Sequence, residues 1–278
     1  MMVSANGADL FMTSRGAGPP CVVLCNLGTR VYEQQMPAAL DAHLQLVFLD
    51  LRGSGRSSGE AADLTFDVLA DDLEAVRAQL GVARLAVLGH SILGMLAIEH
   101  ARRRPAQVSF IITVGTPPFG DMGRLVGAGT AHFDSHASEE RKALLRANMA
   151  GLPPGTPRSQ AVFAQTPMRF FDPRFDARPL FADADIRPKM LMHLLGTLGL
   201  SWKIEADPRA LSVPWLLVLG RYDYIVPLSL WDEHLPGLRS ARREIFERSG
   251  HQPFVEEPDR FAAVVGDWVA GIDARARE

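Results

Sequence analysis

The sequence is poor in cysteine, in long apolar runs and in blocks of charge. Only two of its 278 residues are cysteines, Cys21 and Cys25, and both fall on the same face of one apolar run. Along an extended strand they are too far apart to bridge each other. We therefore expect two buried, reduced thiols, which excludes a disulfide framework and disfavours a redox or metal role.

No stretch of about 18 apolar residues occurs, and the first residues lack the basic segment and apolar core of a secretion signal. The formal charge of −3 comes from interspersed signs, so no basic stripe marks a nucleic-acid partner. We expect a cytoplasmic monomer or homodimer that acts on a small molecule, away from membranes. The sequence shows neither metal-ligand spacing nor a glycine-rich phosphate loop, so we predict no metal and no cofactor.

Short, nearly continuous apolar runs bounded by turn residues predict strands that are covered on both faces. They occur at Cys21–Cys25, Gln45–Asp50, Arg84–Gly89, Val108–Gly115 and Val213–Gly220. Continuous rather than alternating hydrophobicity is typical of a parallel sheet.

Helical periodicity separates these runs, over Thr65–Leu80, Ile92–Arg104 and Pro258–Ile272. Strands that alternate with helices predict an α/β fold with a doubly wound, mostly parallel sheet. In such sheets the functional residues lie beyond the carboxyl ends of the strands.

The alternation stops in the middle of the chain, where prolines and glycines crowd together around helical pieces at Ala137–Met149 and Lys189–Leu200. This stretch is too long for a structureless loop. We predict a core domain formed by residues 1–116 and 209–278, with a helical cap inserted at residues 117–208.

Ser91 follows a predicted strand and begins a helix, in the run Gly89-His90-Ser91-Ile92-Leu93-Gly94. A serine at such a sharp turn is exposed above the sheet, over helix amides that stabilise negative charge. This position suits a nucleophile. An ordinary helix-capping serine would look similar in sequence.

Two further residues occupy the loops that a catalytic triad needs. Asp223 comes just after the strand that ends at Gly220, and His251 lies in a loop before the last helix. The chain order of serine, acid and histidine is the one expected for this kind of sheet. We predict Ser91 as nucleophile, His251 as general base and Asp223 as the acid that orients the histidine; a turn-capping aspartate and a surface histidine are the alternatives.

An oxyanion needs two amide donors. One is expected from the backbone N–H of Ile92, directly after the nucleophile. The turn after the first core strand offers the other, with the N–H of Leu27 the best placed, although an ordinary glycine turn at this point is as plausible.

Together these residues resemble the α/β-hydrolase superfamily, from about residue 5 to residue 272. The segment Asp50–Ser58 is similar to the arginine-glycine turn of proline iminopeptidases, enol-lactonases and epoxide hydrolases, where the resemblance implies a structural role beside the nucleophile. Ser91 argues against epoxide hydrolases and haloalkane dehalogenases, which use aspartate. Proline iminopeptidases are the nearest group, through this turn, the acid motif Gly220–Pro227 and the helix Ala97–Pro105.

The chain departs from that group at three places. The oxyanion loop is Cys25–Thr29, which looks more like that of enol-lactonases, and Leu93 stands where the family has a small residue. The tryptophan-glutamate motif that would hold a substrate amine is absent from the cap, where Glu139 and Glu140 read as a solvated helix face.

The predicted cap is rich in large apolar side chains, which suits an apolar acyl or alcohol group under a lid. We name Phe170, Phe171 and Met192 as candidate substrate-binding residues. The alternative is that these side chains pack the cap against the core.

Four functions remain open at this point. The leading one is hydrolysis of a small, apolar carboxylic ester through an acyl-Ser91 intermediate. Release of an N-terminal proline, and hydrolysis of a lactone or a carbon–carbon bond, are alternatives within the hydrolases. A catalytically silent protein that binds a small ligand is the alternative from another class, with Leu93 as the unusual feature.

Overall fold

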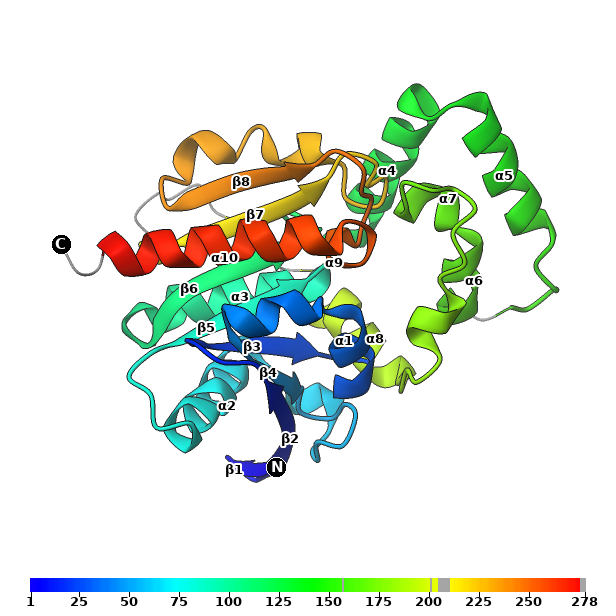
Figure 1. Cartoon of the computed structure of the whole chain (residues 1–278). Helices are drawn as coiled ribbons and strands as arrows, with labels where there is room; N and C mark the ends of the chain where they lie inside the picture. Colours follow the sequence, from blue (N-terminus) through cyan, green and yellow to red (C-terminus); the bar gives the residue numbers. More distant parts are fainter. Residues whose placement is uncertain (157, 201, 205–210, 276–278) are drawn as a thin grey trace.

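The computed structural model describes residues 1–156, 158–200, 202–204 and 211–275. These residues form an eight-stranded sheet in the order β1-β2-β4-β3-β5-β6-β7-β8 (Figure 1). The strands are β1 (Met2–Ala5), β2 (Ala8–Arg15), β3 (Pro20–Cys25), β4 (Gln45–Asp50), β5 (Leu85–His90), β6 (Val108–Val114), β7 (Trp215–Gly220) and β8 (Ala241–Phe246).

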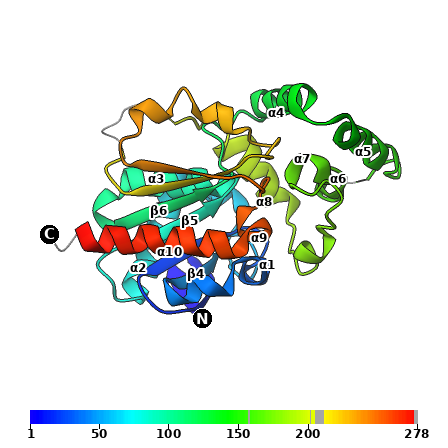
Figure 2. The ribbon, with the colours of Figure 1, turned by 45° about the horizontal axis from the view of Figure 1, so that its top comes forward.

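Strands β3 to β8 run parallel, and only the pairs that involve β1 and β2 are antiparallel. Helices α1 (Thr29–Gln35) and α10 (Pro258–Arg275) cover one face of the sheet, while α2 (Phe66–Gln79) and α3 (Ile92–Arg103) cover the other (Figures 1 and 2). The doubly wound, mostly parallel sheet predicted from the sequence is therefore confirmed. Side chains along β3, β5 and β7 are almost completely buried, which is why these strands have continuous apolar sequences.

The strand order places a switch point in the middle of the sheet. The chain runs from β3 outward to β4, and then returns past β3 to continue through β5 and β6 on the other side. A crevice opens at the carboxyl ends of the strands where the winding reverses. Here that point lies between the ends of β3 and β5, at Cys25 and His90.

Sequence patterns did not reveal the strands at the edges of the sheet. The hairpin β1–β2 alternates buried and exposed side chains, and β8 carries Arg242, Arg243 and Glu244 at the edge of the sheet. Charge on an edge strand protects it from pairing with another chain, and it also removes the apolar run that marks an inner strand.

Helices fill the chain between β6 and β7, at one end of the sheet (Figures 1 and 2). They are α4 (Met122–His136), α5 (Glu139–Ala150), α6 (Arg158–Ala164), α7 (Thr166–Arg169), α8 (Pro188–His193), the 3₁₀ helix η4 (Arg178–Phe181) and the π-helical turn η5 (Leu194–Leu198). We continue to call this insertion the cap. The predicted boundary at residues 208 and 209 lies outside the described residues.

The two cysteines behave as expected for structural thiols. Both are fully buried in β3 and neither forms a disulfide. Burial raises the pKa of Cys21 to about 12, so this thiol stays protonated. In the described ranges, no helix is both long enough and apolar enough to cross a membrane.

Candidate active site

Ser91 lies at the turn between β5 and α3 with a strained backbone. Its φ is 55° and its ψ is −127°, a region that residues other than glycine rarely occupy. The turn is possible because strand and helix touch: a Cβ on Gly89 would lie 2.4 Å from the carbonyl oxygen of Leu93. The serine N–H donates to the carbonyl of Val114 on the neighbouring strand, at 2.8 Å. The predicted nucleophile therefore lies at a tight strand–helix turn.

Leu93 is accommodated at this turn. Its side chain is buried in the main core, while the glycine that follows makes the close contact. A Cβ on Gly94 would lie 1.8 Å from Oγ1 of Thr116, two residues after the end of β6. The space restriction of the elbow is thus satisfied at Gly94, one position later than in the pattern that the sequence resembles.

Asp223 lies just beyond the end of β7 and is buried. One carboxylate oxygen accepts the N–H groups of Ile225 and Val226, at 2.9 and 2.8 Å. The other oxygen lies 2.7 Å from Nδ1 of His251. This arrangement fixes the carboxylate and holds the histidine tautomer that carries its proton on Nδ1, which leaves Nε2 as the basic atom.

His251 is fixed through its backbone as well as its side chain. Its N–H donates to the carbonyl of Arg169 in the cap, at 2.6 Å. Its carbonyl lies 2.9 Å from Nε2 of His90, the residue before Ser91. Burial holds the pKa of His90 well below its usual value, so this ring is neutral and Nε2 carries the proton that it donates. Next to the ring, Gly115 leaves the space that a side chain would fill, since its Cβ would lie 3.0 Å from Nδ1 of His251.

Sheet register brings the predicted oxyanion loop to the nucleophile. Val23 on β3 pairs with Leu88 on β5, and three residues further along each strand come Asn26 and Ser91. Adjacent strands are about 4.8 Å apart. The loop that contains Leu27 therefore starts beside Ser91, where Leu27 and Ile92 were predicted to supply the amides.

Two hydrogen bonds and the conformation of a glycine hold this loop in place. The hydroxyl of Tyr32 on α1 donates to Oδ1 of Asn26 at 2.6 Å, and Gly28 adopts a φ of 91°. The backbone N–H of Asp185, in the cap, donates to the carbonyl of Leu27 at 2.9 Å. The arginine-glycine turn lies alongside, anchored by the buried Asp50, which accepts the N–H of Arg56 at 2.8 Å.

The three predicted substrate-binding residues have different surroundings. Phe170 is buried inside the cap against Phe175, with ring centroids 4.7 Å apart, and Phe171 packs edge-on against Tyr222, beside Asp223. Met192 is 67% exposed on α8. Met192 therefore does not pack the cap against the core, and its role in substrate binding stays a prediction.

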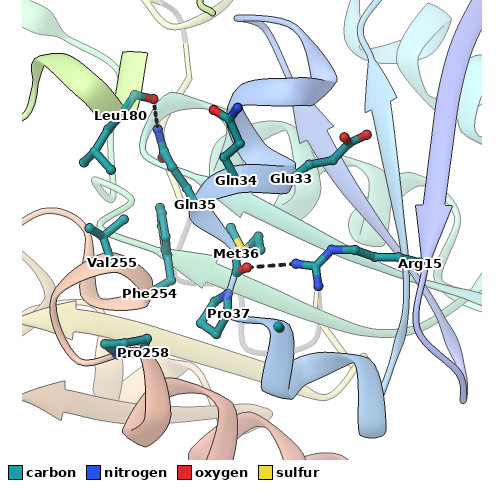
Figure 3. Close-up of a pocket in the computed structure, with 11 residues that line it drawn as sticks. Arg15, Glu33, Gln34, Gln35, Met36, Pro37, Leu180, Phe254, Val255 and Pro258 are labelled. Atoms are coloured by element: carbon teal, nitrogen blue, oxygen red, sulfur yellow. Dashed lines mark hydrogen bonds between the residues drawn. The ribbon is translucent and has the colours of Figure 1, made fainter. Parts of the chain in front are cut away.

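A groove of about 400 Å³ lies between the core and the cap (Figure 3). Its walls come from α1, from the loop after it, from η4 and from the segment around α9 (Pro253–Glu256), as Figure 3 shows with Gln35, Leu180 and Phe254. None of the three predicted triad residues lines it. Phe254 lines this groove and also packs edge-on against His90, with ring centroids 5.1 Å apart. Its ring therefore separates the groove from the residue before Ser91.

The sequence interpretation missed two residues that lie around the loops of the predicted triad. Glu256 accepts the N–H groups of Gly250 and Phe171, and Arg141 donates to carbonyls of the cap. A backbone carbonyl such as that of Arg169 has no signature in the sequence, so no pattern could have identified this contact. Among the described residues, no group of three or more His, Cys, Asp or Glu side chains could hold a metal ion.

Comparison with known proteins gives a consistent assignment. The family described as alpha/beta hydrolase fold matches residues 22–258. The AB hydrolase superfamily protein YclE of Bacillus subtilis (strain 168) is 31% identical over 276 residues, covering 95% of this chain and 96% of that protein. A pimeloyl-(acyl-carrier protein) methyl ester esterase of Aeromonas salmonicida (strain A449) is 27% identical over 267 residues, covering 90% and 95%.

A solved structure, the proline iminopeptidase of Mycobacterium smegmatis, has the same fold. It superposes with a TM-score of 0.78 at 24% identity and covers 99% of both chains. From the match over residues 22–258 and the identity to the Bacillus protein, the chain belongs to the α/β-hydrolase fold family.

Proposed function

We propose that this protein is a serine hydrolase that cleaves a small carboxylic ester through an acyl-Ser91 intermediate. One observation carries the proposal: the buried 2.7 Å contact between Asp223 Oδ2 and His251 Nδ1, whose histidine is bound through its carbonyl to the residue before Ser91. A histidine held in this tautomer exposes Nε2 as a base, which is what activation of a serine hydroxyl requires.

The reaction has two halves. As Ser91 Oγ attacks the ester carbonyl carbon, His251 Nε2 takes the hydroxyl proton, and the amides of Ile92 and Leu27 stabilise the oxyanion. The C–O bond to the leaving group then breaks, and the proton on Nε2 passes to the departing alcohol. Water next attacks the acyl-Ser91 carbonyl while His251 takes its proton, and return of that proton to Oγ releases the carboxylic acid. Asp223 stays ionised throughout and stabilises the imidazolium.

An ester is favoured over an N-terminal proline peptide by two observations. The Aeromonas relative is named as a methyl ester esterase and covers almost the whole chain. In the cap, Glu139 and Glu140 lie at the surface and pair with Lys142 and Arg174, so neither forms a buried site for a substrate amine. The apolar character of the cap favours an apolar acyl or alcohol group.

The experiment compares initial rates on p-nitrophenyl butyrate and on prolyl p-nitroanilide, for the native protein and for Ser91→Ala. We expect ester cleavage that falls by about 10³-fold or more in Ser91→Ala, because loss of a triad member leaves only the oxyanion hole and binding. The matched control is Ser135→Ala, a serine on the exposed side of α4 that bonds only its own helix. Ser135→Ala should keep the full rate.

A fluorophosphonate probe gives a second readout that does not depend on the substrate. It should label the native protein once, on the peptide that contains Ser91, and should leave Ser91→Ala unlabelled. Full esterase activity in Ser91→Ala would refute the mechanism. Preferential cleavage of the anilide would replace the ester assignment with an aminopeptidase, and an unlabelled, inactive native protein would favour a binding function.

A further inference from the structure

One segment of the cap is hydrogen-bonded to the loops of both the acid and the histidine. This segment, Met168–Phe171, is called the strap below. Its Met168 carbonyl accepts the N–H of Tyr224, the residue after Asp223, at 3.0 Å. Its Arg169 carbonyl accepts the N–H of His251 itself, at 2.6 Å. The cap thus contacts the backbone of the proposed catalytic residues directly.

The end of the strap is joined to the histidine loop a second time. One oxygen of Glu256 accepts the N–H of Phe171 at 2.6 Å, and the other accepts the N–H of Gly250 at 2.7 Å. Strap and loop are also in tight contact, since a Cβ on Gly250 would lie 2.1 Å from the Arg169 carbonyl oxygen. A shift of the strap by a fraction of an ångström must therefore move the His251 backbone.

Arg141, on α5, holds the strap from the other side. Its guanidinium donates to the carbonyls of Pro167 and Phe170 at 2.8 Å each, and to that of Phe171 at 2.5 Å. The residue is only 6% exposed and, within the described ranges, forms no ion pair. Its cation also lies 5.4 Å from the ring of Tyr222, which precedes Asp223.

This use of a buried cation needs an explanation, because burial of a charge without a carboxylate is costly. An apolar side chain could fill the same space at no such cost. What an apolar side chain could not do is bind three carbonyls at once, for which the planar, five-donor guanidinium is suited. The arrangement therefore fixes the path of the strap rather than simply filling the cap interior.

We propose that Arg141 is a positioning residue for hydrolysis: by fixing the strap, it sets the place of the His251 backbone, and so of Nε2, relative to Ser91. This inference rests on the function proposed above and adds to it a determinant that lies in the cap, outside the triad. It acts on the chemical step and leaves substrate binding largely unchanged, because the groups that it fixes hold the base.

The test compares Arg141→Met and Arg141→Lys with Arg174→Met. Arg174 is a matched cap arginine that is exposed and pairs only with Glu140 through its side chain. We expect Arg141→Met to lower kcat on p-nitrophenyl butyrate by about 30- to 100-fold with KM changed less than about threefold, a misplacement effect. Arg141→Lys should recover part of the loss, since one ammonium can reach fewer carbonyls. Arg174→Met should match the native protein.

Fluorophosphonate labelling separates positioning from folding. The amplitude of labelling counts the folded, competent molecules, and the rate constant reports how well His251 activates Ser91. We expect Arg141→Met to keep the amplitude and lose at least tenfold in rate, and millimolar guanidinium ion to restore part of the rate in Arg141→Ala. A variant that loses amplitude but keeps the native rate constant would mean a purely structural arginine, and would overturn the proposal.

The two proposals fail in different ways. If the native protein is not labelled, and turnover is insensitive to Ser91→Ala, the serine mechanism is wrong and the role of Arg141 falls with it. If the native protein is labelled at Ser91 and Arg141→Met is labelled at the same rate, only the positioning role is wrong.

Discussion

The cap contacts the loops of the proposed catalytic residues through two segments that differ in burial. The strap reaches the acid and histidine loops through backbone hydrogen bonds and is held by the buried Arg141. The second segment, Asp183–Arg187, called the outer contact below, reaches the oxyanion side. There the N–H of Asp185 donates to Leu27, and the guanidinium of Arg187 donates to the carbonyls of Gly53 and Gly55.

The strap and the outer contact differ in how exposed their side chains are to solvent. Asp183 and Arg187 are each 41% exposed, and Asp183 accepts hydrogen bonds from Arg30 and Gln34 across open surface. Water competes for such pairs and salt screens them, so each contributes little, whereas a buried donor that loses its partner costs the full desolvation penalty. The histidine side of the site should thus be rigidly joined to the cap, and the oxyanion side only loosely.

The largest effect should come from forcing the strap away from the histidine loop. In Gly250→Ala the new Cβ would meet the Arg169 carbonyl at 2.1 Å, and both partners are backbone. We expect a loss of about 2–4 kcal/mol in the free energy of unfolding and a fall in kcat/KM of about 100-fold, measured by urea titration and ester hydrolysis. Gly127→Ala, which adds a methyl in open space on α4, is the control and should be neutral or slightly stabilising. Native behaviour of Gly250→Ala would mean that the strap is free to move.

The stability that Glu256 contributes at the strap and the stability that Asp183 contributes at the outer contact should change with pH in opposite directions. Burial raises the pKa of Glu256, beside the strap, to about 7, and the nearby Asp223 charge adds to the shift. A pKa raised in the folded state means stability that is present at low pH and lost as pH rises from about 4.5 to 7. The advantage of native over Glu256→Gln should shrink across this range by at most about 3 kcal/mol. Urea unfolding at pH 4.5 and 7.5 measures it, and an advantage that grows with pH would contradict the assignment.

Arg187→Met tests the outer contact at its strongest point. It removes the donors to two carbonyls of the arginine-glycine turn, and because the side chain is partly exposed, water replaces them. We expect a loss of about 1 kcal/mol in unfolding free energy and at most a few-fold fall in kcat. Arg178→Met, which bonds only Asp176, is the control. An effect as large as that of Gly250→Ala would show that the two contacts are equally rigid.

The smallest effect belongs to Asp183→Asn. Hydrogen bonds from Gln34 and Arg30 hold the pKa of Asp183 below its usual value, so its contribution is present at neutral pH and lost as pH falls through that lowered pKa. We expect a small loss of stability at pH 7 that disappears in 1 M salt. Thermal unfolding at low and high salt measures the difference, and a loss that persists in 1 M salt would mean a contact that water does not reach.

The fold and the chain order of the proposed triad could be predicted because both depend on the pattern of side chains. The sequence places Asp223 and His251 after a strand and before a helix, and parallel pairing must then bring them to one edge of the sheet. Leu93 departs from the family pattern and was the main reason to doubt the turn at Ser91. The structure shows that Gly94, rather than residue 93, meets Thr116. No pattern of one-letter codes contains that distance.

The remaining features were hidden for two physical reasons. The exposure of Met192 could not be predicted, because a helical apolar pattern gives a face without saying what covers it. The strap was missed because its bonds to Tyr224 and His251 come from carbonyls, which every residue has. Arg141 looked like any basic residue on a polar helix, and only its three carbonyl partners distinguish it.

The strap binds the neighbouring loops through its main chain, and this affects how the cap can change during evolution. Its hydrogen bonds to the acid and histidine loops do not depend on which side chains surround them in the cap, so the specificity of the cap can change while these bonds persist. Descendants of one ancestral protein could therefore change the molecule that they bind without rebuilding the loops of Asp223 and His251. Gly250, Arg141 and Glu256, whose side chains or lack of one the junction depends on, should resist replacement along such a lineage.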